Sequence, residues 1–229
     1  SITYKGGIVL EDSPLGLITN AGDFSTNMNF ENSTTAKVEE TYNQTKIKQS
    51  QVSYNANTLN CSFTNAKKQK ITVLFQVSNN NIAFRYELPA WGETKACVVT
   101  EETTGFKFPS TTTTFLSPMM RPMTGFARTA PSYESGYESD APLDKNTSSN
   151  GYVFPGLFHL GDKAWVLLSE TGVSSSYTAS HLSVYKDGLF TVEYPNPKQN
   201  NGFGSSGAQI SLPAVTPWRT ITVGETLKP

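Results

Sequence analysis

The side chains best suited to chemistry are four carboxylates in one loop, with tyrosines between them. They are Glu134, Glu138, Asp140 and Asp144, with Tyr133 and Tyr137. Carboxylate oxygens on a loop are typical ligands of calcium and typical acceptors for sugar hydroxyls. The spacing matches no cation-binding loop of the D-x-D-x-D-G kind. The alternative is a solvated loop whose acids face water, and spacing alone favours that alternative.

An apolar segment follows this loop and is the element expected to position it. Ala164–Leu168 reads AWVLL between turn residues, which predicts a buried strand. His159 lies just before it, between Phe158 and Leu160, with no metal-ligand partner at useful spacing. We therefore expect His159 to be a half-buried residue with a hydrogen-bond partner rather than a metal ligand.

Alternation of apolar and polar residues predicts strands along most of the chain. Lys70–Val77 and Ile82–Tyr86 alternate on either side of a polar turn and predict a hairpin. Asp187-Gly188 separates two further alternating runs and predicts a type I′ turn. Gly6-Gly7 predicts a similar turn within Ser1–Leu10.

The polar segment Lys37–Ser50 has β-branched residues and no apolar stripe, so we expect an exposed strand that faces water on one side. Ser53–Thr64 is similar, and Pro217–Gly224 reads as the last strand. No long stretch shows helical spacing with caps. Strands at intervals of roughly ten residues predict an all-β protein, a single large two-sheet sandwich over residues 1–229.

Composition narrows the class of partner. The net charge is −1 and only 16% of the residues are charged, so no basic face for nucleic acid is expected. No apolar run is long enough to span a membrane. The abundance of Ser, Thr and Asn is typical of secreted β-proteins, and the lack of a signal peptide at Ser1 suggests a processed chain or a fragment. Cys61 and Cys97 are either free thiols, which we favour, or one bridge.

The sequence contains no nucleophile-elbow, zinc-protease, Walker or Rossmann motif. Glycosidase chemistry needs two carboxylates held across a sugar ring. Acids are present at Glu101, Glu102, Glu134 and Glu138, but their spacing gives no distances. Trp91 and Trp218 are candidates for stacking on sugars, with core or edge packing as the alternative.

Five stretches together resemble the N-terminal domain of glycoside hydrolase family 97, a family of bacterial α-glucosidases and α-galactosidases. They cover nearly the whole chain in order. They are Val9–Leu17 (VLEDSPLGL), Ile82–Tyr86 (IAFRY), Ser132–Tyr137 (SYESGY), Trp165–Gly172 with Glu170, and Thr216–Arg219 (TPWR).

The resemblance implies a β-super-sandwich of the galactose-mutarotase type that packs on a (β/α)8 catalytic barrel of the same polypeptide. The barrel would carry the catalytic residues and act on a carbohydrate, so no catalytic residue is expected here. The resemblance also implies that Glu134 ligates a Ca²⁺ ion at the active site, together with the barrel. A periplasmic or secreted location follows. The alternatives are a stand-alone carbohydrate-binding module and a structural β-domain of a secreted assembly.

Overall fold

Every regular element that the structure describes is a β-strand. The computed structural model describes residues 1–46, 50–119, 136–145, 148–195, 197 and 207–227. Within these ranges no helix is present that has the length and apolar character to cross a membrane. The prediction of an all-β fold is therefore confirmed.

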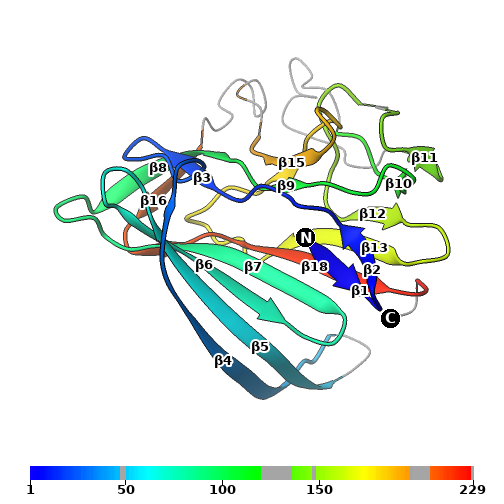
Figure 1. Ribbon diagram of the computed structural model, residues 1–229, viewed down its shortest axis with the longest axis horizontal. Coiled ribbons are helices and arrows are strands. Elements are labelled where there is room, and N and C mark those ends of the chain that lie inside the picture. Colours follow the sequence, from blue (N-terminus) through cyan, green and yellow to red (C-terminus); the bar gives the residue numbers. More distant parts are fainter. Residues whose placement is uncertain (47–49, 120–135, 146–147, 196, 198–206, 228–229) are drawn as a thin grey trace.

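One ten-stranded antiparallel sheet forms the larger layer (Figure 1). Its order is β11-β10-β12-β13-β18-β7-β6-β5-β4, with β17 paired to β7. The bounds are β4 Asn29–Asn43, β5 Gln51–Thr64, β6 Lys70–Val77, β7 Asn81–Leu88, β10 Thr113–Phe115, β11 Ala141–Pro142, β12 Gly156–His159, β13 Trp165–Thr171, β17 Ala214–Val215 and β18 Trp218–Gly224.

The second layer is divided into small sheets, and in Figure 1 the strands β3, β8, β16, β9 and β15 lie above β6, β7 and β18, while β1 and β2 lie beside β13 and β18. One has the order β16-β8-β3, another β14-β15-β9, and β1 and β2 form a separate hairpin. The bounds are β1 Ile2–Tyr4, β2 Gly7–Leu10, β3 Leu17–Thr19, β8 Ala96–Glu102, β9 Gly105–Phe106, β14 His181–Leu182, β15 Phe190–Glu193 and β16 Ala208–Ser211.

Two hydrophobic clusters fill the space between the layers. The first joins the strands β12, β13 and β18 to β2, β9 and β15, and Phe158, Val166 and Leu168 are fully buried in it. The second joins β6 and β7 to the sheet β16-β8-β3, with Leu17 and Val99 at its centre. Burial of apolar side chains from both layers is the main force that holds such a sandwich together.

The hairpin predictions hold, with one correction. Asp187 and Gly188 have φ values of 52° and 87°, as a type I′ turn requires. The turn in the first hairpin lies one residue earlier than predicted. Tyr4 pairs with Gly7, and Lys5 (φ 48°) and Gly6 (φ 81°) occupy the turn. Gly7 is already part of β2.

Two burial predictions need correction. The strand expected at Ala164–Leu168 is β13, but only one of its faces is buried: Val166 and Leu168 point inward, while Trp165 and Leu167 are half-buried. The large sheet is covered on one side only at this strand. The strand expected within Lys37–Ser50 is β4, and it faces water on both sides because it is the edge strand of a hairpin that extends beyond the second layer (Figure 1).

The two cysteines lie on different sheets and are both free. Cys97 is buried in β8, and burial raises the pKa of its thiol. Cys61 in β5 is half-buried. The favoured prediction of free thiols is confirmed.

Candidate functional site

The acidic loop is attached to the edge of the large sheet. β11 pairs with β10 through Thr113–Pro142 and Thr114–Ala141, which holds residues 136–145 against that edge. Glu138 forms an exposed ion pair with Lys145. Asp144 is exposed. Glu134 and Tyr133 lie outside the described residues, so the predicted role of Glu134 stays a prediction.

Among the described carboxylates of this loop, Asp140 has the most contacts. Its Oδ1 accepts a hydrogen bond of 2.8 Å from the Thr113 hydroxyl and lies 3.1 Å from Nδ1 of His159. The contact with His159, and then that with Thr113, lowers the pKa of Asp140. The His159 ring stacks on Trp165 with centroids 4.0 Å apart. His159 is thus a partly exposed residue with a hydrogen-bond partner, as expected.

The described carboxylates do not form a metal site by themselves. Across the ranges that the structure describes, no three His, Cys, Asp or Glu side chains gather where they would hold an ion. Glu138 forms an ion pair with Lys145, and Asp140 contacts His159 and Thr113. Calcium takes about six to eight oxygen ligands, so the described part of this chain does not supply its shell.

The two tryptophans considered as sugar platforms already have partners. Trp91 stacks on Phe24 with centroids 5.1 Å apart, and its Nε1 donates to the carbonyl of Lys70. The guanidinium of Arg85 lies 4.4 Å from the centre of the Trp218 ring. These are packing contacts, and packing at the core or edge was the alternative to sugar stacking for both tryptophans.

The sequence reasoning missed a buried charge network. Arg219 on β18 donates from Nε and Nη2 to both carboxylate oxygens of Glu102, at 2.9 and 2.6 Å. Its Nη1 donates to Glu170 at 2.6 Å and to the Ser180 hydroxyl at 2.8 Å. Ser180 also donates to Glu170 from its backbone nitrogen and its hydroxyl. The side chains of Arg219 and Glu102 are almost fully buried.

This network is structural in character. Burial on its own would lower the pKa of Arg219, but the carboxylates of Glu102 and Glu170 outweigh it and raise that pKa. The arginine therefore stays charged. Glu102 was one of the acids considered for hydrolysis, and here it lies between the layers, bound at both oxygens and shielded from any sugar.

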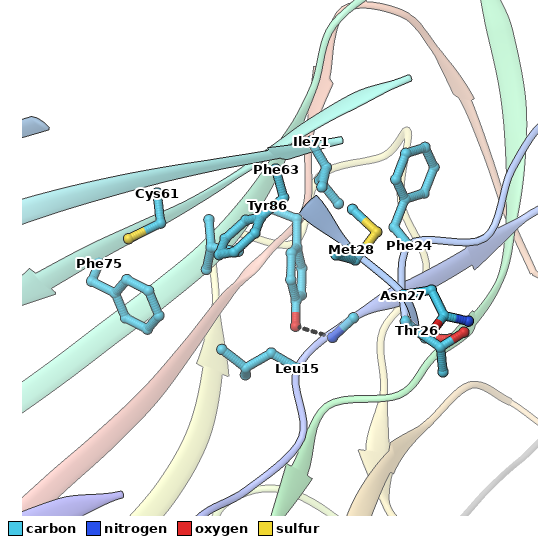
Figure 2. A pocket seen from close by; sticks show the side chains of 13 residues that line it. Leu15, Phe24, Thr26, Asn27, Met28, Cys61, Phe63, Ile71, Phe75 and Tyr86 are labelled. Carbon is cyan, nitrogen blue, oxygen red and sulfur yellow. Dashed lines mark hydrogen bonds between the residues drawn. The ribbon is translucent and has the colours of Figure 1, made fainter. Parts of the chain in front are cut away.

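A mostly apolar cavity of about 270 Å³ lies between the large sheet and the connection from β3 to β4 (Figure 2). Phe63, Phe75 and Cys61 form one wall, and Phe24 and Met28 stand opposite. The Tyr86 hydroxyl at its base accepts a hydrogen bond of 2.8 Å from the backbone nitrogen of Gly16, and it lies 2.7 Å from the Thr104 hydroxyl. Because the buried Tyr86 hydroxyl already has two hydrogen-bond partners, the cavity wall offers mainly apolar contacts.

The described residues form an all-β sandwich, and Glu102 and Glu170 pair with Arg219 inside it. The chain belongs to the family described as Glycosyl-hydrolase 97 N-terminal, which matches it over residues 1–229. The resemblance seen in the five sequence stretches is confirmed.

Three relatives illustrate the match. The crystal structure of a β-arabinopyranosidase is 48% identical with a TM-score of 0.94, over 97% of this chain and 36% of that one. A variant of a Glycoside Hydrolase Family 97 enzyme from Pseudoalteromonas sp. strain K8 is 22% identical with a TM-score of 0.80, over 98% and 32%. A probable retaining α-galactosidase of Streptomyces bingchenggensis (strain BCW-1) is 26% identical over 224 residues, 98% of this chain and 31% of that protein. This chain thus spans about a third of the length of these relatives.

Proposed function

We propose that this chain is the non-catalytic N-terminal domain of a glycoside hydrolase and packs on a (β/α)8 catalytic barrel of the same polypeptide. The observation that carries the proposal is the 48% identity and TM-score of 0.94 to a β-arabinopyranosidase over 97% of the chain. The relatives continue for about twice this length again, which is ample for a barrel of about 250 residues. A whole-chain match to an N-terminal domain family does not favour a stand-alone binding module.

The substrate we propose is a glycoside of galactose configuration. In the L series, a β-arabinopyranoside has the ring stereochemistry of an α-D-galactoside and lacks only the exocyclic hydroxymethyl group. The names of the β-arabinopyranosidase and of the probable retaining α-galactosidase therefore point to one shape of sugar. Between the α-glucosides and α-galactosides expected from the sequence, this supports the galactosides.

The calcium role of Glu134 belongs to the same proposal. One glutamate supplies at most two of the oxygens that calcium needs, and the described part of this chain gathers no further ligands. Glu134 would then complete a shell built by the barrel. A bound calcium ion would supply positive charge close to the sugar. The role of this chain would be to supply one calcium ligand, Glu134. The residues that follow it, 136–145, are held against the sheet edge by the pairing of β11 with β10.

A periplasmic or secreted location completes the proposal. It is supported by the low content of charged residues, 16%, and by the abundance of Ser, Thr and Asn. Fractionation of the source cells with an antibody to this domain is the test, and recovery with the cytosolic marker would contradict it.

The test of the function is hydrolysis by the intact parent enzyme. Nitrophenyl β-L-arabinopyranoside and α-D-galactopyranoside should be cleaved at least about tenfold more efficiently than the α-D-glucopyranoside, because a site built around one axial hydroxyl leaves buried polar groups unpaired with the other sugar. A preference for the glucoside would overturn the substrate proposal. A parent reading frame without a barrel sequence would overturn the domain proposal.

A further inference from the structure

One face of the hairpin strands stays apolar beyond the point where the domain's own core ends. On β6, Ile71, Val73, Phe75 and Val77 point to the same side. Ile71 and Val73 are only 2% and 6% exposed, Phe75 is half-buried, and Val77 is 44% exposed. The apolar pattern of a strand normally marks the face that something covers.

The neighbouring strands repeat this gradient. In the register of the sheet, Phe63 lies opposite Ile71, Cys61 opposite Val73, and Leu59 opposite Phe75. Leu59 is 37% exposed. Phe30, at the start of β4, packs edge-on against Phe63 and is 59% exposed.

We call this surface the apolar hairpin face. It consists of Phe30, Leu59, Cys61, Phe63, Phe75 and Val77. The cavity of Figure 2 opens beside it, and Cys61, Phe63 and Phe75 belong to both. In Figure 1, β4, β5 and β6 extend away from the small sheets, so the second layer does not reach the outer part of this face.

The opposite face of the same strands is different in kind. Ser62 and Thr72 approach within hydrogen-bonding distance there, and the Tyr54 hydroxyl donates to Gln76. Leu74 is the one large aliphatic residue of β6 on that side. The opposite face carries mostly polar side chains, whereas the apolar hairpin face exposes large apolar side chains in a contiguous group. Such patches mark interaction sites on soluble proteins.

We propose that the apolar hairpin face, which lies near the opposite edge of the large sheet from the acidic loop, is a second surface on which this domain docks against the remaining polypeptide of its parent enzyme. The inference rests on the proposed function and names the face involved. The occupant is argued from length: the relatives that contain this domain have about twice as many further residues. A connected domain meets this face at high effective concentration, so even a modest apolar contact is formed.

Cys61 is a built-in probe for this contact, and Cys97 is its control. In the intact parent, iodoacetamide should label Cys61 slowly because the docked domain covers it.

Val77→Lys would place a charge in the contact, and we expect it to speed the labelling of Cys61 by at least about tenfold. The matched control is Val215→Lys, because Val215 is 45% exposed and belongs to β17. It should leave the rate unchanged. Cys97, which is 4% exposed, should stay protected in all three proteins.

Other results would overturn the proposal. One is labelling of Cys61 in the wild-type parent at the rate of an exposed thiol. Another is acceleration of Cys97 in step with Cys61, which would mean that Val77 supports the fold of the domain. Protection that fades on dilution would assign the face to a second copy of the protein. Small-angle scattering keeps the two proposals apart: a compact parent with an unprotected Cys61 would retain the domain proposal and reject this face.

Discussion

The guanidinium of Arg219 and the carboxylate of Glu102 form two parallel hydrogen bonds, at 2.9 and 2.6 Å, between the two layers of the sandwich. Arg219 belongs to β18 of the large sheet, and Glu102 ends β8 of a small one. Glu170 on β13 shares the same arginine. The pairing fixes how the layers are oriented, since bidentate geometry is more restrictive than apolar contact.

The first prediction is that Arg219→Met destabilises the domain strongly. The methionine would leave the carboxylates of Glu102 and Glu170 without their cation, one of them fully buried. Breaking a buried pair in this way costs about 3–5 kcal/mol. At roughly 2–4 °C per kcal/mol for a domain of this size, the Tm should fall by about 6–20 °C. Differential scanning calorimetry measures it.

Arg85→Met is the matched control for that measurement. Arg85 lies on the adjacent strand β7, is partly exposed, and contacts Glu87 at 3.6 Å and the Trp218 ring. Contacts of this kind are worth about 1 kcal/mol or less each. If both substitutions lowered the Tm by the same amount, the buried network would contribute no more to stability than the exposed contacts of Arg85.

The buried network shows where sequence reasoning reaches its limit. Inward positions on β8 run Cys97, Val99, and by strict alternation Glu101. The register between β3 and β8 shifts at this point, since Ile18 pairs with Glu101 but Thr19 pairs with Val99. The extra residue reverses the phase, so Glu102 points inward. A bulge depends on two strands that are distant in sequence, so it cannot be predicted from the residues of either strand alone.

The burial of Arg219, by contrast, could have been predicted from the sequence. Arg219 shares the inward phase of β18 with Ile221 and Val223. A charged residue on an apolar face needs a buried partner, so the alternation alone indicates an ion pair without naming its acid. The hairpins were predictable because their turn residues and alternation are local, as at Asp187-Gly188. The one-sided cover of β13 depends on where the second layer ends, which is a tertiary feature.

The second prediction concerns the pH dependence of the Asp140 contact. Because the folded-state pKa of Asp140 is lowered, chiefly by His159 and then by Thr113, its stabilisation is present above the unfolded pKa of about 3.9. It is lost as the pH falls through the folded pKa. The difference in Tm between the wild type and Asp140→Asn should therefore shrink as the pH falls below about 5, and it should be smallest once the pH lies below the folded-state pKa. A difference that grows on acidification would contradict the assignment.

The third prediction is that the isolated chain does not hydrolyse glycosides. Hydrolysis needs an acid and a second carboxylate held about 5 to 9.5 Å apart around an accessible sugar. Glu102 is bound to Arg219 and Glu138 to Lys145. Prolonged incubation with nitrophenyl α-galactoside and α-glucoside is the assay. Turnover that disappears in Glu134→Gln or Glu138→Gln would contradict this expectation.

The last prediction concerns Glu134 in the intact enzyme. Glu134→Gln removes one charged calcium ligand, so calcium affinity and kcat/KM should fall together by about tenfold or more. The Tm of this domain should barely change, because a loop glutamate that serves another domain adds little to its core. Calorimetric titration with calcium and steady-state kinetics measure the two effects.

Glu138→Gln is the matched control, since Glu138 belongs to the same loop and pairs with exposed Lys145. An exposed pair of this kind contributes little, so calcium affinity and turnover should remain within about twofold of wild type. If Glu134→Gln kept both values as well, Glu134 would be a solvated surface acid. If the Glu138 variant lost calcium instead, the ligand would be Glu138, and its pairing with Lys145 would be confined to the domain without its barrel.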